Sequence, residues 1–344
     1  MRTRYTGRAA IVATLVFAAC SERPTGPLEG PPIASLAISG VRINPVDFKA
    51  TGAFELGLVA SAIDGSAILQ TGVGISATLD SISGGGSGTS AASYKIERSQ
   101  TTATVTNADV RAAILIDDSG SMRDSDPTLL RASAATLFWE SVLPARAGNQ
   151  VAVLDFGVSA TSGFGNTRLI QSWTSSASAL SSTTASIRVG SLGTPLYESL
   201  VELSSWMTAT TTAGQSLVIL LLTDGQPNGS GTRTGAINAA RAAGITIHGV
   251  GLGPASDLGG APDLAAIDAV RAVSEQTGGV YSAATTAGAL APIFKILATV
   301  SSRGQLVGRF RISPVPLSRA RVSGSIVVVS GGKSERASFS FLAP

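Results

Sequence analysis

Three oxygen-bearing side chains alternate along one short segment of the chain. Asp117, Ser119 and Ser121 are spaced two residues apart and directly follow the apolar run Ala112–Ile116. That run is typical of a strand buried on both faces, and open α/β sheets bind ligands beyond the carboxyl ends of their strands. The alternate spacing lets the three oxygens converge on one point. Oxygen donors that include neutral hydroxyls suit a hard divalent cation such as Mg2+.

Two further oxygens follow along the chain. Thr194 stands at the start of a helical stretch, and Asp224 ends the apolar run 217–223. Helix capping by Asp117 and Ser119 is the alternative interpretation, because Asp and Ser are common capping residues. Capping leaves Thr194 and Asp224 without a role. The pattern therefore favours a metal site.

The order of these segments resembles a von Willebrand factor type A (VWA) domain with a complete metal-ion-dependent adhesion site (MIDAS). The resemblance covers about residues 112–302 and includes the later segments 244–253 and 277–281. It implies a site formed by Asp117, Ser119, Ser121, Thr194 and Asp224. In this family the hydroxyls contact the metal directly and the aspartates act mainly through water. The cation, expected to be Mg2+ with Mn2+ or Ca2+ as alternatives, then attracts an acidic residue of a protein ligand.

The elements that must position these residues alternate between strands and helices over residues 111–303. Short apolar runs at 112–116, 151–156, 217–223 and 245–252 are separated by helical stretches, which implies parallel crossovers. We expect an α/β fold with a doubly wound, mostly parallel sheet of the VWA or Rossmann-like kind.

The segments on either side of this α/β unit have the period-two pattern of half-buried strands. Phe54, Leu56 and Leu58 show it in residues 33–110, where no helix is evident and Tyr94–Thr106 is expected to form a strand pair. Residues 304–344 return to the same pattern. The α/β domain is therefore predicted to be inserted in, or flanked by, a β-sandwich made of segments 33–110 and 304–344.

The N-terminus has the features of an export signal. Basic residues precede an apolar run of eleven residues, which is too short to span a bilayer, so residues 1–19 are predicted to be a signal peptide. The run ends at Cys20 and resembles a bacterial lipoprotein cleavage site, although Phe17 stands where that family most often has Leu. Lipidation of Cys20 would give a membrane-anchored lipoprotein, at the outer membrane or cell surface in a diderm organism. The alternative is an ordinary secretory signal. Residues 20–32, rich in Pro and Gly, are expected to form a tether.

Charge and composition argue against other function classes. Removing the three arginines of the signal segment leaves 22 basic and 22 acidic residues, which is not the footprint of a nucleic-acid-binding protein. The single histidine, His248, lies in an apolar strand, and Cys20 is the only cysteine, so the usual Ser/His and Cys/His hydrolase sites are not expected. The favoured function is cation-dependent protein binding at the cell envelope. A constitutive assembly subunit of an envelope complex is the alternative.

Two other charged groups have alternative interpretations. Asp124 and Asp126 could hold a second ion, but Asp126-Pro127 favours a helix cap. Arg309 and Arg311, together with Arg319 and Arg321, could form a basic face for lipid headgroups or acidic glycans. Alternating charge on a strand more often marks a solvated face.

Overall fold

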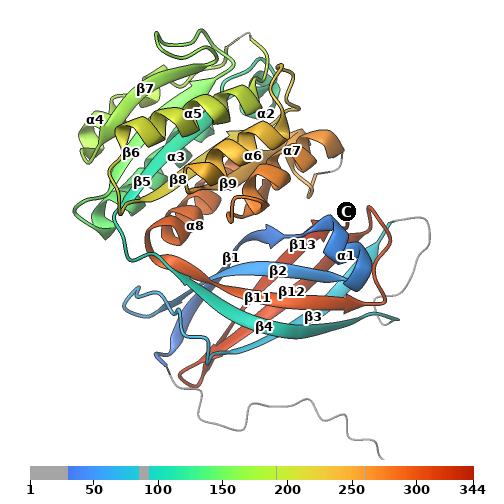
Figure 1. The fold of residues 1–344 in the computed structure, drawn as a ribbon. Coiled ribbons are helices and arrows are strands. Elements are labelled where there is room, and N and C mark those ends of the chain that lie inside the picture. The colour runs from blue at the N-terminus through green and yellow to red at the C-terminus, as the bar shows by residue number, and fades with distance from the viewer. Residues whose placement is uncertain (1–29, 85–92, 191, 260) are drawn as a thin grey trace, which may run out of the picture.

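The structure, a computed structural model, describes residues 30–84, 93–190, 192–259 and 261–344. An α/β domain lies above an antiparallel β-sandwich in the view of Figure 1. The predicted signal peptide, Cys20 and the tether up to residue 29 lie outside the described residues. Within the described ranges, no helix is long and apolar enough to cross a membrane.

The α/β domain is built on a mostly parallel sheet. Its strand order is β10-β9-β8-β5-β6-β7, and only the edge pair of β6 and β7 within this part is antiparallel. The predicted fold class, a mostly parallel α/β sheet accompanied by a separate antiparallel sheet, is confirmed. The strands are β5 (Val110–Asp117), β6 (Gln150–Phe156), β7 (Thr167–Thr174), β8 (Ser216–Thr223), β9 (Ile245–Leu252) and β10 (Tyr281–Ala284).

Helices cover both faces of this sheet because alternate strand residues point to opposite sides. Along β5, Ile114 packs toward α3 and α8, whereas Leu115 packs toward α5, α6 and α7. The helices are α2 (Met122–Ser125), α3 (Leu130–Val142), α4 (Ala177–Ser181), α5 (Leu196–Thr210), α6 (Arg233–Ala242), α7 (Leu264–Glu275) and α8 (Leu290–Arg303). Short 3-10 turns occur at Leu143–Ala145, Thr184–Ser186, Gly253–Ala255 and Ala287–Ala289.

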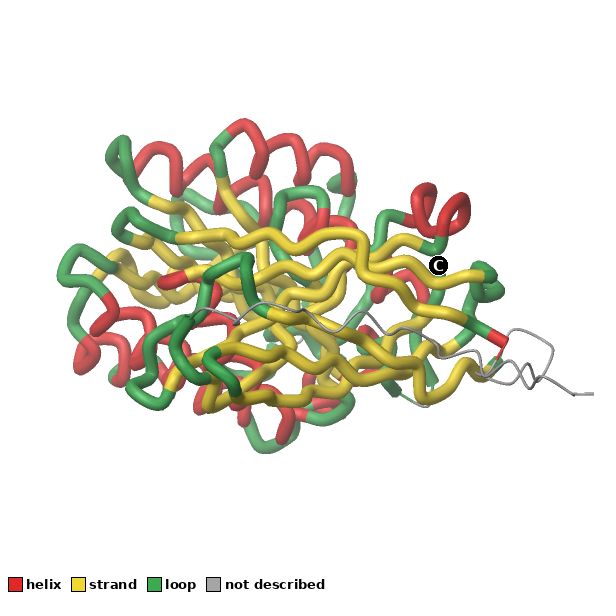
Figure 2. Tube along the Cα trace, turned by 90° about the horizontal axis from the view of Figure 1, so that it is seen from below, coloured by secondary structure: helices red, strands yellow, loops and turns green. Residues whose placement is uncertain are grey.

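The β-sandwich draws its strands from both ends of the described chain. Strand β11 pairs with β2 and β4, and β12 pairs with β3, so the segments before and after the α/β domain share both sheets. Figure 2 shows these strands from below. The strands are β1 (Ile33–Arg42), β2 (Ala53–Ala62), β3 (Gly74–Ser83), β4 (Lys95–Val105), β11 (Gly304–Ser313), β12 (Arg321–Ser330) and β13 (Lys333–Leu342).

Two expectations for the first β segment are wrong. Helix α1 (Pro45–Thr51) interrupts the strands, where no helix was predicted. Asn44 caps it by accepting the amide of Val46 at 2.9 Å, and Gly52 ends it in the left-handed region at φ 70°. The second expectation concerned residues 94–106, which form the single strand β4 rather than a strand pair. Strand β4 pairs with β11 along the full length of β11, so residues 95–105 form one continuous strand without a turn.

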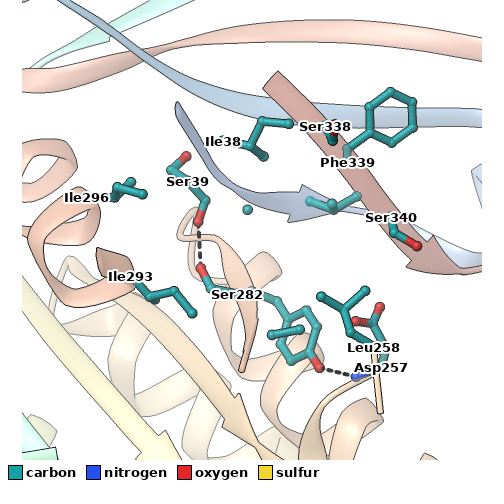
Figure 3. Close-up of a pocket in the computed structure, with 14 residues that line it drawn as sticks. Ile38, Ser39, Asp257, Leu258, Ser282, Ile293, Ile296, Ser338, Phe339 and Ser340 are labelled. Carbon is teal, nitrogen blue, oxygen red and sulfur yellow. Dashed lines mark hydrogen bonds between the residues drawn. The ribbon is translucent and has the colours of Figure 1, made fainter. Parts of the chain in front are cut away.

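The two domains meet along strand β1, which continues the parallel sheet into the sandwich. Val41 of β1 pairs with Tyr281 of β10, and Arg42 donates to the carbonyl of Gly279 at 2.7 Å. A small cavity of about 160 Å3 lies between the domains, lined by residues of β1, β10, α8 and β13. Figure 3 shows Ser282 reaching the backbone of Ser39 across it. The junction therefore contains polar contacts as well as covalent connections.

Candidate metal centre

The predicted ligand residues lie at the carboxyl ends of two adjacent parallel strands. Strand β5 ends at Asp117 and its neighbour β8 ends at Thr223. The Asp117 carboxylate accepts the backbone amide of Ser119 at 2.8 Å through one oxygen and the Thr223 hydroxyl through the other. Asp117 thus fixes the start of the loop against the neighbouring strand.

The two serines of the loop and Asp224 form one hydrogen-bonded chain. The hydroxyls of Ser119 and Ser121 lie 3.2 Å apart, and the Ser121 hydroxyl donates to Asp224 Oδ1 at 2.7 Å. The second carboxylate oxygen of Asp224 accepts a bond from the Ser125 hydroxyl on α2. Both Ser119 and Asp224 are at most 2% exposed. Oxygens from two separate parts of the sequence therefore converge here, with Ser119 and Asp224 buried and Ser121 exposed.

Thr194 completes the group from a third segment. A side-chain carbon placed on Gly225 would lie 3.6 Å from the Ser121 hydroxyl and 3.7 Å from the Thr194 hydroxyl, so both hydroxyls lie beside the same backbone position. The backbone amide of Thr194 donates to the side-chain oxygen of Asn228 at 2.6 Å, and the backbone amide of Asn228 donates to the Thr194 carbonyl at 3.1 Å. Asn228 thereby holds the threonine in place at the start of α5.

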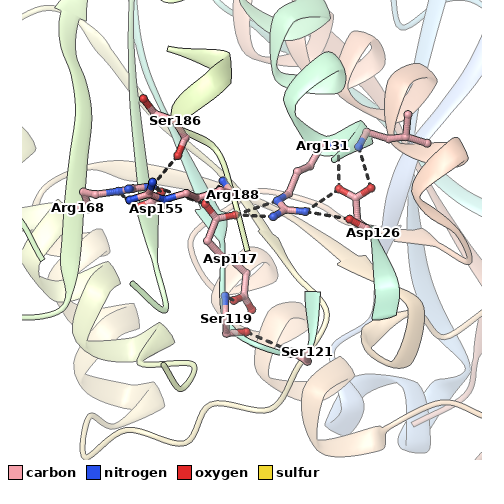
Figure 4. Close-up of polar contacts among 11 residues, drawn as sticks. Asp117, Ser119, Ser121, Asp126, Arg131, Asp155, Arg168, Ser186 and Arg188 are labelled. Atoms are coloured by element: carbon pink, nitrogen blue, oxygen red, sulfur yellow. Dashed lines mark hydrogen bonds and ion pairs between the residues drawn. The ribbon is translucent and has the colours of Figure 1, made fainter. Parts of the chain in front are cut away.

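A buried ion network supports the loop from behind, as Figure 4 shows. Arg131 of α3 contacts Asp118 through Nε at 2.9 Å and through Nη2 at 2.8 Å. Its Nη1 lies 2.9 Å from the carboxylate of Asp126, and all three side chains are fully buried. Arg168 of β7 pairs with Asp155 and lies 3.8 Å from Asp118. Because Asp118 stands between Asp117 and Ser119, this network anchors the loop to two elements beside it.

Close backbone packing also fixes the loop. Gly157 has φ +83°, which favours glycine, and a side-chain carbon there would lie 2.5 Å from the amide nitrogen of Ser119. Gly190 meets the same obstacle, because its side-chain carbon would lie 2.8 Å from the Asp118 carbonyl. These glycines allow the segments after β6 and before α5 to pack directly against the loop.

The electrostatics of the cluster favour a cation. Burial raises the pKa of Asp117 to about 7, hydrogen bonds from Ser119 and Thr223 act in the opposite direction, and the charge of Asp224 raises it further. No group of three or more His, Cys, Asp or Glu side chains suited to a metal occurs in the described part of the chain. The donors at this cluster are instead mostly hydroxyls.

The structure brings together all five residues predicted for the site, from three segments of the sequence. The Asp126 carboxylate accepts the amides of Leu130 and Arg131 in the first turn of α3, but the N-cap residue of that helix is Leu129 and Pro127 lies before it, so the cap predicted at Asp126-Pro127 is wrong in its position. His248 is buried and its Nδ1 accepts the Val280 amide at 3.3 Å, as expected for a packed strand residue.

Four supporting residues were missed by the sequence analysis: Thr223, Ser125, Asn228 and Arg131. Thr223 directly precedes Asp224 in an otherwise apolar strand, which was a usable signal. Ser125, Asn228 and Arg131 contact residues far from them in the sequence, and the periodicity of apolar residues does not indicate such contacts.

Residues 112–226 match the family model described as the von Willebrand factor type A domain. The match supports a VWA domain here. It spans the metal loop, Thr194 and Asp224, which all lie within the matched residues. A search of the curated proteins found no match.

Several solved structures resemble the chain at low identity. A von Willebrand factor type A protein from Catenulispora acidiphila is 12% identical, with a TM-score of 0.42, and 91% of this chain aligns with 74% of that one. The vWF domain of the type V pili tip protein Mfa5 from Porphyromonas gingivalis is 15% identical, with a TM-score of 0.41 and coverages of 57% and 95%. Proximal thread matrix protein 1 from the mussel byssus, solved with a zinc-occupied MIDAS motif, is 17% identical, with a TM-score of 0.43. The alignment covers 62% of this chain and 50% of the mussel protein.

Proposed function

We propose that the VWA domain binds one divalent cation and uses it to bind another protein. The observation that carries this proposal is the convergence of three hydroxyls and two carboxylates at the carboxyl ends of β5 and β8. Ser119, Ser121 and Thr194 would hold the cation together with Asp117 and Asp224. Helix capping alone would not bring residues from three segments to one point.

The chemistry of the donors fits a hard cation. Every side-chain donor is an oxygen, and no sulfur or imidazole takes part, which favours Mg2+, with Mn2+ or Ca2+ as alternatives. Asp117 and Asp224 are buried, and no Lys or Arg side chain among the described residues bonds to either carboxylate, so the protein itself does not compensate the negative charge that they carry. A bound cation would compensate that charge.

The two carboxylates orient the hydroxyl groups in addition to supplying negative charge. Asp224 accepts hydrogen bonds from Ser121 and Ser125, so it orients the Ser121 oxygen toward the cluster. Asp117 holds the Ser119 amide and therefore the loop. A bound cation supplies positive charge for an incoming acidic group, because neutral hydroxyls do not cancel it. We therefore propose that the protein partner presents an Asp or Glu residue to this face.

The wider biological role is also a proposal. A binding module rather than an enzyme is supported by the burial of His248, the only histidine, away from the metal cluster. The balanced charge of the mature chain gives no reason to invoke nucleic acid. The signal sequence and Cys20 support an exported, membrane-anchored lipoprotein of the cell envelope. A constitutive assembly subunit, in which the cation only stabilises the loops, remains the second candidate because the buried ion network already fixes the loop.

Thermal unfolding with Mg2+ and with EDTA tests the metal site. A ligand that binds only the folded state at about 100 times its Kd stabilises it by about 2.7 kcal/mol. We expect Mg2+ to raise the Tm of the wild-type chain and of the Thr208→Ala control, which changes a threonine on the outer part of α5. The Thr194→Ala and Asp117→Ala variants should lose most of this increase. An undiminished increase in both variants would place the cation elsewhere.

Capture of partners from envelope extract tests the binding role. The wild-type chain and the Thr194→Ala variant are each used with Mg2+ and with EDTA. Adhesion through the cation predicts partners that are retained only by the wild-type chain with Mg2+. Partners retained equally in all four conditions would favour constitutive assembly and contradict the adhesion mechanism, while leaving the fold unaffected.

A further inference from the structure

A second polar pocket lies on the β-sandwich, away from the metal cluster. It has a volume of about 330 Å3 and lies over strands β2, β4 and β11 beside helix α1. Its lining residues are Asp47, Thr51, Ala53, Ser99, Gln100, Arg309 and Arg311. Such a volume is at the lower end of the range for small-molecule sites, about 300–1,000 Å3.

The two arginines are held on the outer face of the sheet by the packing of their neighbours. Phe310 and Ile312, which alternate with them along β11, are each 1% exposed and belong to the sandwich core. Arg309 and Arg311 therefore project from the opposite face, and both are exposed. Their backbones are hydrogen-bonded on both sides, to β2 and to β4, so the spacing of the two side chains is fixed by the sheet.

Neither guanidinium has a hydrogen bond or an ion pair with any residue that the structure describes. Two glutamates lie opposite them in register, Glu55 beside Arg309 and Glu97 beside Arg311. Glu55 instead lies 3.6 Å from Arg42, and Glu97 does not line the pocket. The forked donors of both arginines are thus available to an anion, which a guanidinium binds through two parallel hydrogen bonds.

The other polar groups of the pocket are mainly acceptors. The Thr51 hydroxyl donates to the Asp47 carbonyl at 2.8 Å, and the Ser99 hydroxyl donates to the Arg309 carbonyl at 3.2 Å. Each hydroxyl has therefore used its one proton and can only accept from a ligand. The carboxylate of Asp47 also only accepts, whereas the amide of Gln100 can do both. A ligand that satisfies this pocket must carry an anionic group and several hydroxyl donors.

We propose that this pocket binds an anionic saccharide, a sugar unit that bears a carboxylate or a sulfate. The anionic group binds to Arg309 and Arg311, and the sugar hydroxyls donate to Asp47, Thr51 and Ser99. A simple phosphate or sulfate ion would bring no hydroxyl donors for these acceptors. The lining also contains only one apolar residue, Ala53, so it offers little to an acyl chain or an apolar peptide side chain.

The test uses the full chain and calorimetric titration with a uronic acid hexasaccharide. The Arg309→Gln and Arg311→Gln variants should each bind about tenfold more weakly or worse, because each loses a charge-assisted hydrogen bond. The matched control is Arg336→Gln, which changes an exposed strand arginine on the other sheet and should bind as the wild type does. The methyl ester of the hexasaccharide, which has no charge, should bind at least tenfold more weakly. Equal binding of the ester, or equal losses in the control, would overturn the proposal.

Asp47→Ala separates a sugar site from a simple anion site. Removing this negative charge should strengthen binding of a bare anion, but it should weaken hexasaccharide binding several-fold because the sugar hydroxyls lose their acceptor. Inorganic sulfate and vesicles with anionic phospholipid are titrated in parallel. Sulfate binding as tight as hexasaccharide binding, stronger hexasaccharide binding by Asp47→Ala, or arginine-dependent binding of the vesicles alone would each refute a saccharide site.

Discussion

Replacement of Arg131 by Met should strongly destabilise the VWA domain. The side chain is fully buried and makes contacts of 2.8–2.9 Å with the carboxylates of Asp118 and Asp126, which are also fully buried. Removing one partner of a buried ion pair typically costs about 3–5 kcal/mol, because the remaining charge is left without compensation. Asp118 would still accept a hydrogen bond from the amide of Arg188 at 2.9 Å, and Asp126 would still accept one from the amide of Leu130 at 2.8 Å. These remaining donors favour the lower end of the range, about 3 kcal/mol.

Urea unfolding at pH 7 measures this loss, which is a large share of the ~5–15 kcal/mol that stabilises a typical domain. The matched control is Arg241→Met, an exposed arginine in the last turn of α6, which should change stability by less than about 0.5 kcal/mol. After Arg131→Met, Asp118 keeps only the longer 3.8 Å contact with Arg168, which also pairs with Asp155. Adding Asp118→Asn removes one of the two carboxylates that lose Arg131, so the double variant should be more stable than Arg131→Met alone. A loss below about 1 kcal/mol in Arg131→Met, or no recovery in the double variant, would refute the reasoning.

Three further predictions concern the loop, the domain junction and the N-terminus. Gly157→Ala should lower the free energy of unfolding by about 1–3 kcal/mol more than Gly214→Ala, because both glycines have positive φ but only Gly157 packs against Ser119. It should also weaken the stabilisation by Mg2+. Equal losses of unfolding free energy in the two variants would contradict this prediction. Glu275 of α7 accepts the amide of Ile43 at the domain junction at 2.8 Å, and burial raises its pKa to about 8. The folded chain therefore binds more protons than the unfolded chain between about pH 4.5 and 8, and stability should fall as pH rises through this window. Glu275→Gln should remove up to about 1.4 kcal/mol per pH unit of that slope in urea unfolding from pH 5 to 8, and an unchanged slope would refute it. Mass spectrometry should find an acylated Cys20 as the mature N-terminus, whereas a free N-terminus elsewhere would indicate ordinary secretion.

The sequence predicted the parts of the fold that depend on local patterns. Strand β9 occupies the predicted range, Ile245–Leu252, and β6 and β8 differ from their predicted ranges by one residue. These strands are buried on both faces, so continuous apolar runs mark them clearly. Helix α1 was missed because only Phe48 is buried in it, which gives no helical periodicity. Asn44 before it and Gly52 after it were the available signals, because both are common at helix ends.

The candidate site was predictable for a different reason. Asp117 and Asp224 stand at the ends of β5 and β8, so the ends of two apolar runs indicate where these side chains lie, whereas Thr194 precedes α5 and was marked by the start of a helical pattern. The ion network behind it was not predictable, because Arg131 and Asp118 are far from Arg168 in sequence and lie together only through the packing of α3 and β7 around β6. A solvated surface arginine and a buried one have the same appearance in a sequence without tertiary contacts.

The network also bears on how a cation would bind. A loop that must become ordered on binding loses part of the binding free energy to conformational entropy. Here Asp118, Gly157 and Asn228 already hold the loop and Thr194 through contacts that do not involve the proposed cation. The five oxygens are therefore largely preorganised, and most of the free energy of cation binding can appear as affinity. It follows that variants such as Asn228→Ala should weaken Mg2+ binding although Asn228 is not a proposed ligand. The affinity for the proposed cation would then depend on residues around the site as well as on the oxygens within it.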